Sequence, residues 1–499
     1  MANSLAHPLD PPARILHGRQ RTRLVGTVGL AFVVVGVLAS SRADGWDAET
    51  THAGLTEQAA LASRLHQVLT SSHGRELGLY ASLALLPRDA TALAERLGHI
   101  PSSIGSIRDS RGRMSAFAWL VAGSVIEDMP LGRSVLHFCH PSRNGTGTEK
   151  TRTKGNAGEA TAMGCDGLGR EHPSALEWIE RTENDLGIGR FWLELEQAAV
   201  AATVSERDGH LARALLHAGA LLHVLEDVGS PTRARGDSKA HVGWLGPGYF
   251  DRGARFERLA SLTYGRLGVP ATTRTGAANR IRARDFFAAP DGRGLADITA
   301  TRWYSANTLP RSLRIPRRLV RGELRELFAA AQPLPLPIPA TDIGLDELES
   351  SAPGGIARDS AGVCLANYRR TAGGKLEWSI SDDCAVAQLA SILPEIGSYA
   401  AAFLDWLFRG TLDVEPDGTV LAAGFAAGKG TISLLSEDAA GNRRPVATVQ
   451  TGGCLKGERI ASFGAAVPAE ATRLVAVFNG VDAVGEQVVA VGSVVAVEK

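Results

Sequence analysis

The chain has 499 residues, a formal net charge of zero, and 44% hydrophobic and 21% charged residues. These proportions are those of ordinary globular proteins, and the length allows two or three domains that each bury a core. No block of Lys and Arg is long enough to form a duplex-binding surface. Extended nucleic-acid binding is therefore disfavoured, whereas a small phosphorylated substrate held by metal ions is not.

Residues 1–45 have the pattern of an export signal. The basic stretch RTR precedes an apolar run at 24–41, and the small residues Ala43 and Gly45 occupy the cleavage-site positions before Trp46. Cleavage there would make Trp46 the first residue of a mature secreted or periplasmic protein. The alternative is an uncleaved membrane anchor with the rest of the chain facing the exterior, since about 18 apolar residues is near the lower limit for spanning a bilayer.

Five cysteines are consistent with an oxidising destination. Cys364 and Cys384 bracket a hairpin-like segment, and Cys139 and Cys165 bracket a Gly-rich loop, so we expect these two disulfides, with Cys454 left over. Four cysteines can pair in three ways, so the sequence alone leaves the connectivity open. The alternative is five reduced thiols.

Helical spacing dominates the chain as far as Gly410. It is found at about 55–97, 115–128, 174–202, 207–228 and 386–409. Loop-like segments rich in Gly, Ser, Thr or Pro lie between them, at about 138–173 and 230–253.

After Gly410 the chain changes to short β-branched runs separated by Gly, Asn and Asp, which predicts strands. We therefore predict a mainly α fold. It comprises an all-helical domain of roughly 360 residues at 46–410 and a small all-β, sandwich-like domain at 411–499.

The segment LLHVLEDVGSP places His223 and Asp227 four residues apart, on one face of a helix. Such a pair can grip one metal ion, although taken alone it is more often a hydrogen-bonded couple. Two other segments add candidate ligands. SVIEDMPLGRSVLHFCHP carries Asp128 and His137, and GWDAETTH carries Trp46 and His52.

Together these segments resemble the zinc-dependent phospholipase C and single-strand-specific zinc nuclease superfamily, exported helical enzymes whose mature chain starts with tryptophan. The resemblance covers about 46–409 and rests on EDMPLGR, HFCHP and HVLEDVGSP, with GLADITATRWYSANTLP as a further match. It implies two neighbouring zinc ions with Asp227 as the bridging ligand. The implied ligands are Asp128, His137, His223 and Asp227 for one ion, and Trp46, His52 and Asp227 for the other.

A chain that begins at Trp46 offers a ligand that a peptide nitrogen cannot replace. A free α-amino group titrates near pH ~7.7 to 8.0, so it gives up its proton to a metal at little cost, and its nitrogen and carbonyl oxygen can close a five-membered chelate. The other interpretation of Trp46 is an aromatic residue that happens to follow a processing site.

By the same resemblance, two zinc ions polarise a phosphodiester and lower the pKa of a bound water towards neutrality, which gives a hydroxide for in-line attack. Asp128 would also orient or deprotonate the attacking water. This chemistry needs no protein nucleophile.

The family's third zinc site is incomplete in this chain. Arg233 and Gly253 stand where the family has histidines, whereas Glu257 matches the family's glutamate. His241 can substitute if its loop folds inward; otherwise His241 is an exposed loop residue and Glu257 a solvated helix residue. Arg233 also suggests a role of its own, because a guanidinium can bind a substrate phosphate bidentately.

The sequence thus predicts an exported zinc-dependent hydrolase that releases phosphorylated head groups from phospholipids and contacts a membrane surface. A nuclease of the same superfamily is the first alternative. Its base-stacking residues would come from aromatic side chains that core or loop packing also explains: Trp303, Tyr304, Trp244 and Tyr249. The second alternative is a non-catalytic relative that binds through its β domain, whose strands carry no ligand motif.

Overall fold

The structure is a computed structural model of the chain. It describes residues 46–100, 109, 111–130, 132–139, 141, 174–237, 255–264, 278–314, 354–467 and 472–497. The export signal, His241, Trp244, Tyr249 and Cys165 lie outside these residues. Within the described ranges, no helix combines the length and apolar character needed to cross a membrane.

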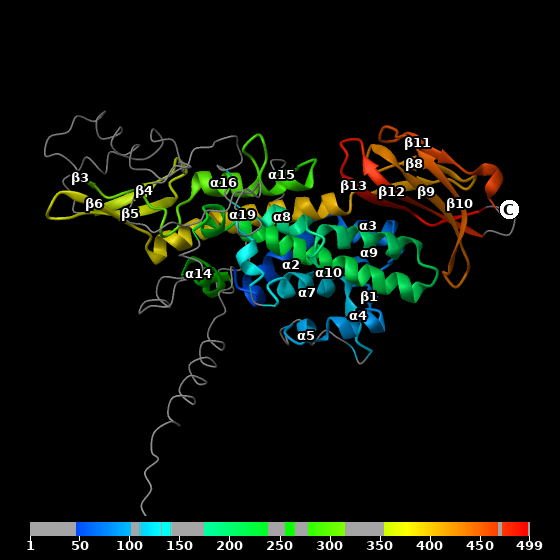
Figure 1. Ribbon diagram of the computed structural model, residues 1–499, viewed down its shortest axis with the longest axis horizontal. Coiled ribbons are helices and arrows are strands. Elements are labelled where there is room, and N and C mark those ends of the chain that lie inside the picture. The colour runs from blue at the N-terminus through cyan, green and yellow to red at the C-terminus, as the bar shows by residue number, and fades with distance from the viewer. Residues whose placement is uncertain are drawn as a thin grey trace, which may run out of the picture. The chain divides into compact units, whose positions relative to one another are not determined.

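The first part of the chain is mainly helical and the last part is a β domain, as the sequence predicts. Figure 1 shows the helices running from blue to green, with α19 in yellow. The described helices before the β domain are η1 (Ala48–His52), α2 (Ala53–Ala62), α3 (Leu65–Ser71), η2 (Gly78–Tyr80), α4 (Pro87–Ala92), α5 (Ala94–Leu97), α7 (Ala116–Ile126), η3 (Ser134–Leu136), α8 (Ala175–Glu180), α9 (Ile188–Val200), α10 (Val204–Val228), α11 (Pro231–Ala234), α14 (Arg255–Tyr264), α15 (Ala283–Phe287), α16 (Leu295–Arg302) and α19 (Asp382–Leu407).

The prediction of an all-helical domain up to Gly410 is wrong in detail, because two small sheets interrupt it. Strands β1 (Ser82–Leu83) and β2 (Met114–Ser115) pair antiparallel. A second sheet has the order β3-β6-β5-β4. Its strands are β3 (Leu313–Arg314), β4 (Gly354–Arg358), β5 (Cys364–Arg370) and β6 (Lys375–Ser379).

The helical stretch expected at 174–202 is also divided in two, into α8 and α9. Asn184 lies between them and uses its side chain locally, because its Oδ1 accepts from the backbone N–H of Leu186 at 3.0 Å and its Nδ2 donates to the carbonyl of Trp178 at 3.0 Å. Such side-chain bonds compete with helical ones and favour a turn.

Helices α7 and α10 run side by side (Figure 1) and touch through their backbones. A Cβ atom placed on Gly219 of α10 would lie 1.8 Å from the carbonyl oxygen of Leu120, and one placed on Gly123 of α7 would lie 1.9 Å from that of Leu216. Only glycine therefore fits at these two positions. The close contact fixes the position of each helix along the axis of the other.

Local signals set the ends of these two helices. Ser115 accepts from the N–H of Ala118 at the start of α7. Thr203 and Glu206 form a capping box at the start of α10. Gly229 follows the last turn of α10, and Pro231 then opens the short helix α11. Helix α10 is thereby continuous over the 25 residues that carry His223 and Asp227.

The β domain is built from one hydrogen-bonded array with the order β10-β9-β12-β13-β7-β8-β11, and β14 pairs with the start of β12. All its pairs are antiparallel except β13 with β7. Its strands are β7 (Thr411–Val414), β8 (Thr419–Ala422), β9 (Ala427–Glu437), β10 (Arg443–Thr451), β11 (Arg459–Ser462), β12 (Arg473–Asp482), β13 (Gln487–Gly492) and β14 (Val495–Ala496).

Side chains of β12 and β13 alternate between two cores. Leu474, Ala476 and Phe478 belong to the core of the β domain itself. Val475 and Val477, by contrast, belong to the core formed by the helices. Helix α9 packs against both strands, so the sheet is buried on both faces here.

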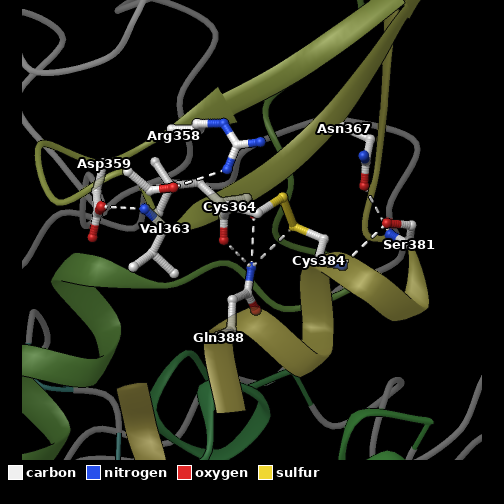
Figure 2. Close-up of a disulfide and its surroundings, with 10 residues drawn as sticks. Arg358, Asp359, Val363, Cys364, Asn367, Ser381, Cys384 and Gln388 are labelled. Carbon is white, nitrogen blue, oxygen red and sulfur yellow. Dashed lines mark hydrogen bonds between the residues drawn. A yellow bond between two sulfur atoms is a disulfide. The ribbon is translucent and has the colours of Figure 1, made fainter. Parts of the chain in front are cut away.

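The predicted disulfide between Cys364 and Cys384 is confirmed and joins β5 to α19. Figure 2 shows Gln388, one turn further along α19, beside this disulfide. Its Nε2 donates to the backbone carbonyls of Cys364 (3.1 Å) and Leu365 (2.9 Å). Cys139 is also disulfide-bonded, but its predicted partner lies outside the described residues. Cys454 is free, as expected.

The glycine contact gives a stability prediction. Gly219→Ala should lower the free energy of unfolding by about 3 kcal/mol, because the new methyl group overlaps a backbone carbonyl that no side-chain movement can clear. Denaturant unfolding measures this. The control is Gly189→Ala in α9, where an added Cβ meets nothing within 4 Å; that variant should be unchanged or more stable by up to about 1 kcal/mol. Equal effects of the two substitutions would contradict the prediction.

Helix α10 also carries a buried histidine, His217, whose titration should make stability depend on pH. Burial and then the charge of Arg213 lower the pKa of His217 from 6.5 to about 3. The unfolded chain therefore binds one more proton than the folded chain between these values, so the free energy of unfolding should rise with pH across this window, by up to about 1.4 kcal/mol per pH unit.

Substitution of His217 by leucine tests this pH dependence. Both ring nitrogens lack a hydrogen-bond partner among the described residues, so an apolar side chain leaves no partner unpaired. Between pH 3 and 6.5, the free energy of unfolding of the variant should rise less steeply with pH than that of the wild type, by the contribution of one proton. Denaturant unfolding at several pH values measures both slopes. Identical slopes in the two proteins would refute the assignment.

Candidate metal centre

Four buried side chains converge in the helical part of the chain. One ligand atom from each of Asp128, His137, His223 and Asp227 lies within 4.8 Å of every other. The sequence predicted these four together as one ligand set. Two carboxylates and two imidazoles form a donor set suited to zinc.

Separate elements bring these residues together. Asp128 lies in the turn that ends α7, and His137 follows η3. Two backbone hydrogen bonds hold the segment directly after His137. The carbonyl of Phe138 accepts from the N–H of Ala175 at 3.0 Å, and the N–H of Cys139 donates to the backbone carbonyl of Arg233 at 3.4 Å.

His223 is oriented by the neighbouring helix. Its Nδ1 contacts the carbonyl oxygen of Ser124 at 2.7 Å. A carbonyl accepts only, so Nδ1 carries the proton, and Nε2 is free to face Asp128 Oδ1 at 3.3 Å and Asp227 Oδ2 at 3.5 Å. Ser124 directly follows Gly123, so the glycine contact between the helices also sets this hydrogen bond.

The two carboxylate oxygens of Asp227 face different groups. Oδ2 lies 2.7 Å from His137 Nδ1 and 3.5 Å from His223 Nε2. Oδ1 lies 3.4 Å from Nε2 of His52, whose ring stacks on His223 at 3.7 Å between centroids. A carboxylate placed between two groups of nitrogens in this way is suited to bridge two cations.

Trp46 lies beside this arrangement, fully buried. Its indole Nε1 donates to the backbone carbonyl of Glu226 at 2.9 Å, and its ring packs on Phe256. The start of the proposed mature chain is thereby fixed next to Asp227. Of the two predicted members of the second site, His52 thus lies 3.4 Å from Asp227, and Trp46 contacts the residue that precedes Asp227.

The cluster contains buried polar atoms without partners, and such atoms are rare in folded proteins. Among the described residues, no hydrogen-bond partner is found for either oxygen of Asp128, for Oδ1 of Asp227 or for Nε2 of His52 and His223. Several unpaired acceptors that face one another fit a bound cation. The donor set therefore fits zinc.

Charge interactions set the protonation of the cluster. Burial alone would raise the pKa of Asp227, but Arg233 and the surrounding histidines hold it well below its usual range. Asp128 behaves similarly, since His223 outweighs the effect of burial and lowers the pKa of its carboxyl. Burial would lower the pKa of His223, yet Asp128 and Asp227 raise it well above its usual range. Both aspartates are thus anionic at neutral pH.

Two glutamates that were not predicted from the sequence face the ring nitrogens of His52 and His137 that point away from the cluster. Glu226 Oε2 lies 2.6 Å from Nδ1 of His52, and Glu127 Oε1 lies 3.5 Å from Nε2 of His137. Each directly precedes a cluster aspartate. The dipeptide Glu-Asp occurs at 127–128 and 226–227 but also at 437–438 in the β domain, so it does not by itself identify them.

Arg233, predicted to bind substrate, lies against the cluster. Its side chain is fully buried, its Nη2 is 3.2 Å from Asp227 Oδ2, and its Nη1 donates to the carbonyl of Ser134. The guanidinium also stacks on Phe138, 4.9 Å from the ring centroid. Its Nε and Nη2 have no hydrogen-bond partner in the described part of the chain.

The described residues bring no further ligand to a third metal site. Glu257 is buried rather than solvated, and its Oε1 accepts from the Ser230 hydroxyl at 2.7 Å and from the Thr232 hydroxyl. Burial raises the pKa of this carboxyl. His241, its suggested partner, lies outside the described residues. Glu257 therefore remains a predicted ligand without an observed partner ligand.

The aromatic residues suggested for a nuclease site are not accessible where they are described. Trp303 and Tyr304 follow α16 and are 1% and 3% exposed. They pack under Arg302 and Arg235, respectively. Neither ring can stack a base in this structure.

No family profile and no curated protein matches the chain. Among solved structures, alpha-toxin of Clostridium perfringens from avian strain SWCP is similar at 11% identity and a TM-score of 0.30, over 91% of this chain and 99% of that one. Alpha toxin from Clostridium absonum is similar at 9% identity and a TM-score of 0.29, over 91% and 100%. Similarity this low transfers no residue role, so the chemistry is inferred from the chain's own side chains.

Metal addition tests the cluster directly. Zinc at about 1,000 times its dissociation constant should raise the free energy of unfolding of chelator-treated protein by about 4 kcal/mol, because the ion binds only the folded cluster. Asp227→Asn should abolish this gain, since an amide cannot offer two anionic oxygens.

The matched control is Asp405→Asn on α19, another buried aspartate, whose partner is Arg64. That variant should keep the full response to zinc. An Asp227→Asn protein stabilised by zinc as strongly as the wild type would exclude the cluster as the binding site.

Proposed function

We propose that the protein is an exported zinc-dependent phosphodiester hydrolase of the phospholipase C type, which releases phosphorylated head groups. The observation that carries this proposal is the buried convergence of ligand atoms from Asp128, His137, His223 and Asp227, several of which have no hydrogen-bond partner among the described residues. The motif resemblance to zinc-dependent phospholipases C supports it. Residues 1–45 are proposed to be removed on export, so that Trp46 becomes the mature N-terminus.

The proposed ligands of one zinc are Asp128, His137, His223 and Asp227, and those of its neighbour are Trp46, His52 and Asp227. When bound, such ions supply Lewis-acid polarisation of the phosphodiester and a water of lowered pKa. A third ion would use Glu257 and His241.

The chain's own groups have distinct tasks in this proposal. Asp128 is the only one of the four clustered residues with measurable exposure, at 7%. Its anionic carboxylate is therefore the group that can accept a proton from the attacking water. Arg233 is proposed to donate to a substrate phosphate oxygen through Nε, which has no hydrogen-bond partner among the described residues. A guanidinium suits this task because its donors form a rigid fork.

Phosphocholine ester hydrolysis tests the proposed activity. Mature protein should release p-nitrophenol from p-nitrophenylphosphorylcholine, lose this activity with a chelator and regain it with zinc. Asp128→Asn should lower kcat by about 100-fold or more, the size expected for loss of a general base. Cleavage of single-stranded DNA without phosphocholine ester hydrolysis would favour a nuclease; zinc binding without either activity would favour a non-catalytic binding protein.

Arg233 is tested separately. Arg233→Ala should raise KM for the phosphocholine ester roughly 10-fold or more, since charge-assisted hydrogen bonds contribute about 1.5 to 3 kcal/mol each. Arg233→Lys keeps the charge without the fork and should recover only part of the loss. Unchanged KM and kcat in Arg233→Ala would remove Arg233 from the proposed substrate site.

A further inference from the structure

We infer that Glu226 and Glu127 are positioning residues, which hold two metal-facing histidines in place from behind. This inference rests on the proposed function, because it concerns the same cluster. It gives a role to the Glu-Asp dipeptides at 127–128 and 226–227. In each, the aspartate faces the cluster and the glutamate faces the far nitrogen of a histidine.

The geometry is clearest at Glu226. Its Oε2 lies 2.6 Å from His52 Nδ1, and its Oε1 accepts from the Thr56 hydroxyl at 3.0 Å. Both side chains of the pair are fully buried. Since an ionised carboxylate only accepts, His52 Nδ1 is the donor, and Nε2 is the nitrogen that faces Asp227 Oδ1, 3.4 Å away.

Glu127 faces His137 less closely. Its Oε1 lies 3.5 Å from Nε2, at ion-pair distance, and Nε2 has no hydrogen-bond partner among the described residues. Its carboxylate is held in turn by Arg133, whose Nη2 donates to both of its oxygens at 2.8 Å, and by Trp178 Nε1, which donates at 2.9 Å. Arg133 also donates to Asp185 at 3.0 Å, and that side chain is half exposed. Arg133 is the arginine of the EDMPLGR motif, so the motif encodes both an aspartate of the cluster and the support of His137.

A carboxylate behind a ligand histidine fixes the ring and makes its free nitrogen a better donor to metal. The three histidines of this site are all backed by an acceptor: a carbonyl for His223 and carboxylates for His52 and His137. These contacts therefore fix which ring nitrogen of each histidine faces the cluster.

The test is zinc affinity, measured on apoprotein by competition with a fluorescent chelator. Glu226→Gln keeps an acceptor for His52 Nδ1 but removes the charge, and zinc affinity should fall by about 10- to 100-fold. Thr56→Val keeps the shape of Thr56 while freeing one oxygen of Glu226, so it should lower the affinity by a smaller factor. Glu127→Gln should also weaken binding, and by less than Glu226→Gln because its contact with the histidine is longer.

The matched control is Glu194→Gln. Glu194 forms the same kind of buried pair with His210 of α10, at 2.7 Å, outside the cluster. This variant should bind zinc as the wild type does. Wild-type protein that binds no zinc would refute the proposed function. Wild-type binding with unchanged affinity in Glu226→Gln and Thr56→Val, or an equal loss in Glu194→Gln, would overturn the positioning role alone.

Discussion

The backbone contact between α7 and α10 at Gly123 and Gly219 sets the geometry of the candidate metal centre. It places the carbonyl of Ser124 against His223, and it brings the turn after α7, with Asp128, to the level of Asp227. Because backbone atoms make this contact, its spacing cannot adjust through side-chain rotamers. The side chains of the cluster are therefore mounted on a rigidly packed helix pair. This suits a site whose ligand side chains must keep their positions to within tenths of an ångström.

The sequence predicted the parts of the fold whose signals are local and strong. The helix predicted at 207–228 corresponds to α10, and the β domain followed from repeated β-branched runs. A hairpin-like segment was expected between Cys364 and Cys384, where β5 pairs with β6, but the four-stranded sheet that contains it was not expected within a helical domain. Segments such as KLEWS are short and mix exposed charges with few buried side chains, so their pairing depends on neighbours and on the disulfide rather than on their own periodicity.

At the site, too, residues within local motifs could be predicted, and contacts between distant segments could not. The four clustered residues could be predicted because family-like motifs surround them. Glu226 could not, because its partner His52 is 174 residues away along the chain and only the folded structure brings the two together. The sequence also did not predict the ion pair of Arg233 with Asp227, because this contact depends on the turn that leads from α10 into α11. A guanidinium there is a cation that cannot dissociate, so part of the charge of Asp227 is balanced in every state of the protein.

The shared burial of β12 and β13 limits how the molecule can be dissected. One face of these strands completes the helical core, and Arg443 of β10 donates from its backbone to Ala202, at the end of α9. A chain cut at Gly410 would leave apolar surface on both fragments. The helical part and the β domain thus share one apolar core, which separating them would expose.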